Sequence, residues 1–267
     1  MDLDGGDRFL VIDVVDPRSI DRAEYLAALN RSFPGWGGDA MFDWCYLRGN
    51  ADLLVVRDRG RLLAGSGVVY RDVRADGETM RAGIICGAWT DPDARGRGLF
   101  SDLMESARAL IGQRDAAMLI GFVRADNPSA RALRSLGWTM VPARYLRVGA
   151  GSQPALGAAE SRTLHLGDFA RSSTHFVYTD DEWRAQFIDR PKPVRWVGSD
   201  GWRAIVEGNR LLDLAGDRER AIEQLGDLSA YSTTSEEWPG FETTAGFVAI
   251  TGSTIPTEWD IRNGDRM

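Results

Sequence analysis

The fold is decided by one stretch of sequence, Thr90-Asp91-Pro92-Asp93-Ala94-Arg95-Gly96-Arg97-Gly98-Leu99-Phe100. It joins an expected strand over about 78–90 to an expected amphipathic helix over roughly 97–112. The first N–H groups of a helix have no partner within the helix, and the helix dipole places partial positive charge there. Two glycines let the backbone turn at this point, and two arginines add guanidinium charge and forked donors. The stretch therefore predicts an anion site suited to a pyrophosphate.

The same stretch differs from two well-known phosphate-binding motifs. A Walker A loop needs a Lys-Ser/Thr pair, which is absent here. The dinucleotide fingerprint needs three glycines over six positions, and this stretch does not provide them. Taken alone, the glycines and arginines are also typical of a simple turn with surface arginines, so that alternative stays open on these residues.

Strands and helices alternate in the expected structure around this stretch. Apolar runs and turn residues predict strands over 8–15, 52–57, 61–71, 78–90, 116–123 and from Trp138 to about Val148. Asp16-Pro17 predicts a helix with Asp16 as its N-cap. Further helices are expected over 40–48, 97–112 and 128–136. This order indicates an α/β or α+β protein with a mixed sheet.

The second half of the chain has a weaker pattern. Residues 149–160 are small and flexible and predict a linker between a domain at 1–148 and a domain at 161–267. Helices are expected from Thr179 to about Ile188 and over 218–229. Strands are expected over 194–197, 202–207, 210–214, 246–251 and 257–262. These elements could form a degenerate second copy of the first half, although no motif repeats in them.

Composition excludes several classes of function. The 267-residue chain carries 32 basic and 39 acidic residues, a net charge of −7, which argues against a general DNA or RNA binder. Two distant cysteines form neither a disulfide framework nor a zinc-site pattern, so we expect no metal. No window approaches 18 apolar residues and the N-terminus does not resemble a signal peptide, so we expect no membrane span and a cytoplasmic location.

The order of elements and motifs resembles the GNAT superfamily of N-acetyltransferases over about residues 8–148. That family carries an Arg/Gln-x-x-Gly-x-Gly/Ala loop after its fourth strand, and an Asn-containing turn, a helix and Leu-Gly-Phe/Trp after its fifth. The matching residues here are Arg95, Gly98, Asn127, Leu136, Gly137 and Trp138. The resemblance implies a mixed, largely antiparallel sheet flanked by helices. It leaves open whether the C-terminal half is a degenerate second unit of the same kind.

The resemblance also implies a donor site for acetyl-CoA or another acyl-CoA between the fourth and fifth strands. Main-chain groups of Ala88 and Thr90 would pair with the pantetheine arm as an added strand would. N–H groups of the glycine-rich loop would hold the pyrophosphate. The implied donor-binding set is Ala88, Trp89, Thr90, Arg95, Gly96, Arg97, Gly98, Leu99, Phe100, Asn127 and Ser129. Catalysis would then be mostly positioning of amine and thioester.

Two positions depart from the family pattern. Phe100 stands where the loop usually has its last glycine or alanine, a variant that resembles larger, two-part relatives. Leu133 stands where the family usually has the tyrosine that protonates the leaving thiolate, and leucine cannot donate a proton. Because the reference pKa of a thiol is about 8.5, a thiolate can still leave without an acid.

The general base and the acceptor site have only weak candidates. The expected fourth strand has no carboxylate over 82–88, and Cys86 could line the acceptor site or be an inert core residue. His165 and His175 could each act as base or simply be structural. Two-part aminoglycoside acetyltransferases of the enhanced-intracellular-survival type use their C-terminal carboxylate as base, which suggests that of Met267 here. Trp36, between glycines in a loop, could contact the acceptor.

We therefore expect an N-acyltransferase acting on a primary amine of a small molecule, such as an amino sugar, an aminoglycoside-like compound or a biosynthetic intermediate. The C-terminal domain at 161–267 would wall the acceptor pocket. One alternative keeps the fold but takes the acyl group from an acyl-carrier protein or an aminoacyl-tRNA. Another is a non-catalytic module that binds coenzyme A. No DNA or membrane partner is expected, and a homodimer is left open.

Overall fold

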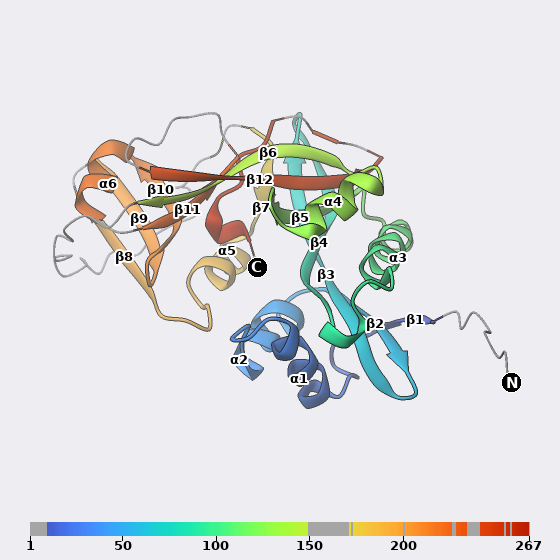
Figure 1. The fold of residues 1–267 in the computed structure, drawn as a ribbon. Helices are drawn as coiled ribbons and strands as arrows, with labels where there is room; N and C mark the ends of the chain where they lie inside the picture. The colour runs from blue at the N-terminus through green and yellow to red at the C-terminus, as the bar shows by residue number, and fades with distance from the viewer. Residues whose placement is uncertain are drawn as a thin grey trace, which may run out of the picture. The chain divides into compact units, whose positions relative to one another are not determined.

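The chain forms two compact units in a computed structural model (Figure 1). Unit 1 comprises Met1–Val69 and Ile85–Leu110, and unit 2 comprises Tyr70–Ile84 and Ile111–Met267. Strands β3 (Arg61–Ala75) and β4 (Glu78–Thr90) each continue from one unit into the other, so neither unit is an unbroken stretch of sequence. The structure describes residues 10–148, 171, 173–199, 201–225, 228–233, 241–253, 255–256 and 258–266. The fold is mixed α/β with a large, mostly antiparallel sheet and flanking helices, as expected.

Unit 1 contains strands in the order β1-β2-β3-β4. β1 (Ile12–Val15) pairs antiparallel with β2 (Ala51–Asp58), which pairs antiparallel with β3. The tight turn expected between β2 and β3 is present. Arg59 and Gly60 there have φ of 50° and 84°, as a two-residue hairpin turn requires. Apolar residues on β2, such as Leu53 and Val56, are fully buried, which fixes the register of the strand.

The helices of unit 1 confirm the expected elements, with one correction. They are α1 (Arg22–Ser32), α2 (Asp39–Phe42), a π-helical turn η1 (Asp43–Leu47), a 3-10 turn η2 (Pro92–Ala94) and α3 (Leu99–Gln113), whose last three residues belong to unit 2. The expectation that Asp16 caps the first helix is wrong. Its carboxylate accepts the Arg18 N–H in a separate turn, and Asp21 caps α1 five residues later by accepting the Glu24 N–H at 3.0 Å.

Unit 2 contains most of the strands, in the order β4-β5-β12-β6-β11-β10-β9-β8, with β7 beside β3. β4 pairs in parallel with β5 over Ala82–Ile84 and Met118–Ile120, and most of the remaining pairs are antiparallel. In Figure 1 the long strands β12 and β6 run side by side, and the C-terminal turn lies beside α5. The elements of this unit after β4 are β5 (Met118–Arg124), α4 (Pro128–Ser135), β6 (Thr139–Val148), β7 (His175–Val177), α5 (Asp180–Phe187), β8 (Val194–Ser199), β9 (Trp202–Glu207), β10 (Arg210–Gly216), α6 (Arg218–Leu225), β11 (Ser229–Ser232), β12 (Phe241–Gly252) and a 3-10 turn η4 (Asn263–Asp265).

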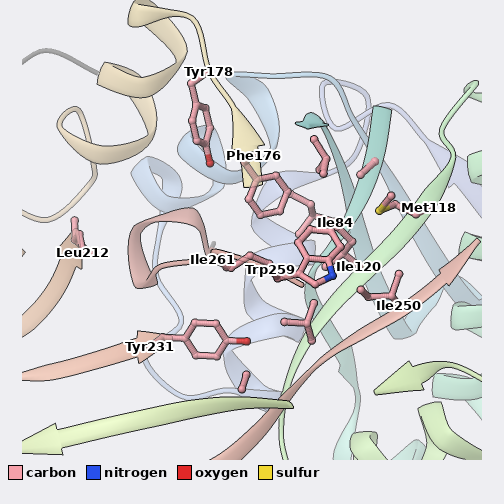
Figure 2. Packing of buried hydrophobic residues seen from close by; sticks show 14 of the residues in the cluster. Ile84, Met118, Ile120, Phe176, Tyr178, Leu212, Tyr231, Ile250, Trp259 and Ile261 are labelled. Carbon is pink, nitrogen blue, oxygen red and sulfur yellow. The ribbon is translucent and has the colours of Figure 1, made fainter. Parts of the chain in front are cut away.

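An apolar cluster joins the strands of unit 2 to its C-terminal segment (Figure 2). Ile84 and Ile120 of neighbouring strands are fully buried in it. Ile261 near the C-terminus is also fully buried, and Phe176 of β7 is almost completely buried. Burial of a side chain of this size contributes about 1.5–3 kcal/mol. Few backbone hydrogen bonds hold the short β7 and the C-terminal segment. Packing of their side chains in this cluster therefore holds both in place.

Three expectations for the second half need correction. Ser229, expected as the end of a helix, instead begins strand β11, which was not expected and which pairs with β6 and, at Ser229, with β10. β7 has no counterpart among the expected strands. Residues 258–262, the described part of the strand expected at 257–262, form isolated bridges at Trp259 and Arg262 instead of a strand. The linker expected at 149–160 lies outside the described residues, and the division at 148 stays a prediction. Within the described part of the chain, no helix is long and apolar enough to cross a membrane.

Candidate functional site

The glycine-rich loop before α3 presents exposed backbone N–H groups. Gly96 and Gly98 have φ of 78° and 80°, a conformation that L side chains rarely adopt. A Cβ at either position would meet no atom within 4 Å, so backbone conformation rather than crowding requires these glycines. The Gly98 carbonyl accepts the N–H groups of Ser101 (2.8 Å) and Asp102 (3.1 Å) and so begins α3.

These N–H groups are free to bind an anion. Among the described residues, no hydrogen-bond acceptor faces the N–H groups from Gly96 to Phe100, whereas the Arg95 N–H donates to the Pro92 carbonyl at 3.5 Å. Residues 95–98 are exposed, Leu99 is buried and Phe100 is half-buried. The loop thus has the donors, the helix start and the arginine side chains that the sequence predicted for a pyrophosphate.

A buried aspartate fixes the backbone just before this loop. The Asp91 side chain has no exposed surface and forms ion pairs with Arg31 and with Arg61, the latter at 3.0 Å. It also accepts the Asp93 N–H at 3.0 Å and so caps the turn η2. Its own N–H donates to the Leu63 carbonyl at 2.8 Å. One carboxylate therefore ties α1, β3 and the start of the loop together.

The pKa of Asp91 lies below its ordinary value. Burial raises this pKa, but the Asp93 N–H and the guanidinium groups of Arg61 and Arg31 lower it by more. Because the folded-state pKa is lower than the unfolded one, the stabilisation is complete above the unfolded pKa of about 3.9. It is lost as the pH falls through the folded-state value.

We expect Asp91→Asn to lower the free energy of unfolding by about 2 kcal/mol at pH 7, because charge-assisted hydrogen bonds are each worth roughly 1.5–3 kcal/mol and both arginines are half exposed. Urea unfolding measures this effect. The difference from the unchanged protein should be constant from pH 5 to 8 and shrink below about pH 4. Asp93→Asn is the matched control, since 80% of its side chain is exposed. Equal effects of the two substitutions would contradict the role given to Asp91.

Strand β4 bends at Gly87, next to the expected donor residues. Gly87 has a φ of 60°, and burial loses its alternation there: Cys86 and Trp89 are buried, while Gly87 and Ala88 are both half-buried. The Tyr46 hydroxyl donates to the Cys86 carbonyl at 3.3 Å. A Cβ at Gly87 would lie only 2.6 Å from that hydroxyl oxygen. Tyr46 therefore holds the strand at the bend, a role that the sequence did not reveal.

An aromatic cluster lies beneath this bend. The rings of Tyr25, Phe42, Tyr46 and Trp89 meet edge to face, and Trp36 stacks on Tyr46 with centroids 6.0 Å apart. Gly67 leaves room for the Tyr46 ring, since a Cβ there would lie 2.3 Å from a ring carbon. Trp36 is half-buried, so it packs on this cluster and keeps an accessible face. Cys86 is buried, and its thiol is not a surface group.

Gly87→Ala tests the bend. A side chain at this φ costs about 1–2 kcal/mol, and the overlap with the Tyr46 hydroxyl adds about 1 kcal/mol. In a Tyr46→Phe background the overlap is gone, so the same substitution should cost about 1 kcal/mol less. Unfolding in urea of the four proteins of this cycle measures the coupling. Additive effects, within about 0.5 kcal/mol, would mean that the hydroxyl does not restrain the bend.

The expected residues after β5 lie in unit 2 and have structural roles. Asn127 is exposed and caps α4, since its side-chain oxygen accepts the Ser129 N–H at 3.2 Å. Ser129 is half-buried in the first turn of α4. Leu133 is only 2% exposed and packs in the core. The cap explains Asn127 without a ligand, and its contact with a donor stays a prediction.

The candidate bases remain unassigned by the structure. His175 lies on β7, half-buried, with Nδ1 2.5 Å from the Ser173 carbonyl oxygen, which orients its ring. His165 and Met267 lie outside the described residues. No group of three or more potential metal ligands occurs among the residues that the structure describes. The glycine-rich loop before α3, the β4 bend and Trp36 are all in unit 1, and together they form the candidate site.

Comparison with known families identifies the part of the chain that carries this loop. Residues 17–141 match the family model described as an acetyltransferase (GNAT) domain. The match covers just under half of the 267 residues and includes the glycine-rich loop, the β4 bend and α4. No curated protein matches the chain. We refer to residues 17–141 as the GNAT-like segment, and the subtype of two-part aminoglycoside acetyltransferases stays a prediction.

Solved structures show that the resemblance in fold extends beyond the GNAT-like segment. A probable N-acyltransferase of Enterococcus faecalis V583 has a TM-score of 0.61 at 9% identity, covering 91% of this chain and 72% of that chain. A GCN5-related N-acetyltransferase of Kribbella flavida has a TM-score of 0.57 at 15% identity, covering 90% and 71%. A structure from Pyrococcus horikoshii has a TM-score of 0.57 at 11% identity, covering 97% and 95%. At these identities the likeness shows the fold.

Proposed function

We propose that the protein is an N-acyltransferase that moves an acyl group, acetyl in the simplest case, from coenzyme A to a primary amine of a small molecule. The observation that carries the proposal is the loop at Gly96–Phe100, whose N–H groups have no backbone acceptor among the described residues and which is preceded by the buried Asp91. The match of the GNAT-like segment to an acetyltransferase family model supports the same proposed function. Amino sugars, aminoglycoside-like compounds and amine intermediates of biosynthesis are the proposed acceptors.

The residues present fit a pyrophosphate-bearing donor. The loop N–H groups would hold the pyrophosphate, and Arg95 and Arg97 would add positive charge. Backbone groups of Ala88 at the β4 bend would orient the pantetheine arm, while the Thr90 carbonyl already accepts the Ser32 hydroxyl at 3.1 Å. Bound acyl-coenzyme A would supply a thioester whose acyl carbon an amine can attack, with the thiolate of coenzyme A as leaving group.

The protein contributes mainly position to this reaction. Amine nitrogen and acyl carbon must be held within reach, which can account for a large part of the rate enhancement. Leu133 supplies no proton, and a thiol pKa near 8.5 lets the thiolate leave unprotonated. Trp36, with its accessible face, is the proposed acceptor contact.

Binding and turnover together test the proposal. Coenzyme A at 100 times its Kd should stabilise the folded protein by about 2.7 kcal/mol and raise the Tm by several degrees. Acetyl-CoA with a panel of small amines should then release free thiol. Stabilisation without turnover would favour the non-catalytic module. No stabilisation, together with co-purification of a carrier protein or tRNA, would favour the alternative donors.

A further inference from the structure

Three aromatic rings of unit 2 surround the guanidinium group of Arg266. The Arg266 Cζ lies 4.4 Å from the ring centroid of Tyr231, 4.7 Å from that of Tyr145 and 5.8 Å from that of Phe122. These rings come from β11, β6 and β5, of which β5 and β6 are consecutive strands and β11 lies far from both in sequence. We call Phe122, Tyr145 and Tyr231 the aromatic cage.

The three rings of the cage meet at steep angles rather than stacking face to face. Tyr231 meets Tyr145 at 71° with centroids 5.1 Å apart, and meets Phe122 at 83° with centroids 5.9 Å apart. Ring faces carry negative charge density, so rings set at steep angles around one point attract a cation from several sides. Figure 2 shows the Tyr231 ring extending from β11 into the apolar cluster of unit 2, where it is 3% exposed.

The cage also has polar atoms suited to a ligand with N–H groups. The Tyr145 hydroxyl accepts a hydrogen bond from the Arg266 guanidinium at 3.2 Å. The buried Tyr231 hydroxyl has no hydrogen-bond partner among the described residues. Phe122, Tyr145 and Arg266 are only half-buried, so part of the site is accessible to solvent. Burial raises the pKa of both tyrosines, and the hydroxyls stay neutral at physiological pH.

The segment that brings Arg266 to the cage has anchors of its own. The Asp265 carboxylate is buried and accepts from Arg171 (2.5 Å), Tyr178 (3.0 Å) and the Arg262 N–H (2.7 Å). Gln186 donates to the Gly264 carbonyl at 2.7 Å. Residues 264–265 therefore have contacts that hold them in place independently of the Arg266 side chain.

We infer that the aromatic cage is a binding site for a small organic cation, an alkylguanidinium or alkylated ammonium group, which Arg266 fills until such a ligand displaces it. The inference does not depend on the proposed acyl transfer. A side chain tethered beside its site acts at an effective concentration in the millimolar range or above. With an effective concentration of ~10 mM for the tethered guanidinium and a Kd of about 1 mM for either cation, a free cation should bind about 10-fold more weakly while Arg266 is present.

The test uses the full chain, with N-methylguanidinium and tetramethylammonium chlorides as probes and sodium chloride at equal ionic strength as the salt control. NMR titration of the tyrosine and phenylalanine ring signals reports binding. We expect Arg266→Ala to bind at least one probe ~10-fold or more tightly than the unchanged protein does. Arg195→Ala, which removes an exposed arginine on β8, is the matched charge control and should behave as the unchanged protein.

Removal of a ring completes the test. Phe122→Leu in the Arg266→Ala background should lose most of the gained binding, because an aliphatic side chain gives no cation–π attraction. Phe122 is half-buried, so this change is tolerated better than one at the buried Tyr231; Tyr231→Phe, which keeps the ring, should retain the gain. The inference is overturned if Arg266→Ala binds no more tightly than the unchanged protein. It is also overturned if Phe122→Leu leaves the gained binding intact.

Discussion

Replacement of Gly98 by tryptophan should abolish the thermal stabilisation that coenzyme A gives and reduce kcat/KM at least ~100-fold, a loss of about 2.7 kcal/mol of transition-state stabilisation. Gly98 has a φ of 80°, and its carbonyl begins α3. A side chain there meets open space, the same space from which a pyrophosphate would approach the loop N–H groups. A bulky indole should therefore block the donor. Thermal shift and steady-state kinetics measure the effect.

Gly60→Trp is the matched control for this prediction. Gly60 also has a positive φ, 84°, and open space around a Cβ, but it lies in the β2–β3 turn. The two substitutions should thus cost the fold a similar 1–2 kcal/mol of backbone strain. Coenzyme A binding should survive in Gly60→Trp alone. Equal loss in both variants would show that general destabilisation, and not the loop, is responsible. Full binding in Gly98→Trp would refute the donor loop itself.

Asp265→Ala should lower the free energy of unfolding by about 3–5 kcal/mol, the usual cost of removing one partner of a buried ion pair. The carboxylate has no exposed surface, and Arg171, its partner, is 7% exposed. Burial lowers the pKa of Arg171, but Asp265 and Asp213 raise it by more, so the guanidinium stays charged. Without Asp265 a buried positive charge loses one of its two carboxylates. Chemical unfolding monitored by circular dichroism measures the loss.

Asp189→Ala provides the comparison for a surface ion pair. Asp189 is paired with Arg184 at 3.4 Å, and both side chains are more than half exposed. Its loss should change the free energy of unfolding by less than about 0.5 kcal/mol. If Asp265→Ala were as mild, the buried network around the C-terminal turn would not hold that segment.

The fold of the first half could be predicted well because its signals are local. β4 over Glu78–Thr90 agrees with the expected strand, and α3 and α4 begin within two residues of their expected starts. The start of α1 was wrong because both Asp16 and Asp21 are good caps. The sequence pattern alone cannot say which of two caps the chain uses when a turn separates them.

The second half was harder because its short strands depend on distant partners. β7 has three residues and pairs with Asp72–Arg74, about a hundred residues earlier. β11 follows α6, and the apolar spacing of that helix in the sequence continues through Leu228. Only pairing with β6 and β10 makes residues 229–232 a strand. Segment 258–262 has strand composition but forms only isolated bridges.

The candidate site could be predicted where backbone conformation, rather than contacts between distant side chains, forms it. The positive φ of Gly96 and Gly98 and the helix start after them follow from the residue types in the loop. The ion pairs of Asp91 with Arg31 and Arg61 could not be foreseen, because these partners lie 60 and 30 residues away. Tyr46 was missed for the same reason. Its hydroxyl matters only because Gly87 bends β4 beside it.

The interleaving of the two units along the chain has a consequence for biosynthesis. When the ribosome has made residues 10–69, unit 1 still lacks Trp89, which packs against Tyr25 with ring centroids 5.8 Å apart, and lacks the α3 helix. Translation at roughly 5–20 residues per second must first add residues 70–84, which belong to the other unit. Apolar side chains of unit 1 therefore remain without the residues that cover them, such as Trp89, for several seconds during synthesis. A nascent chain halted near residue 84 should be a better chaperone client than one halted beyond residue 113.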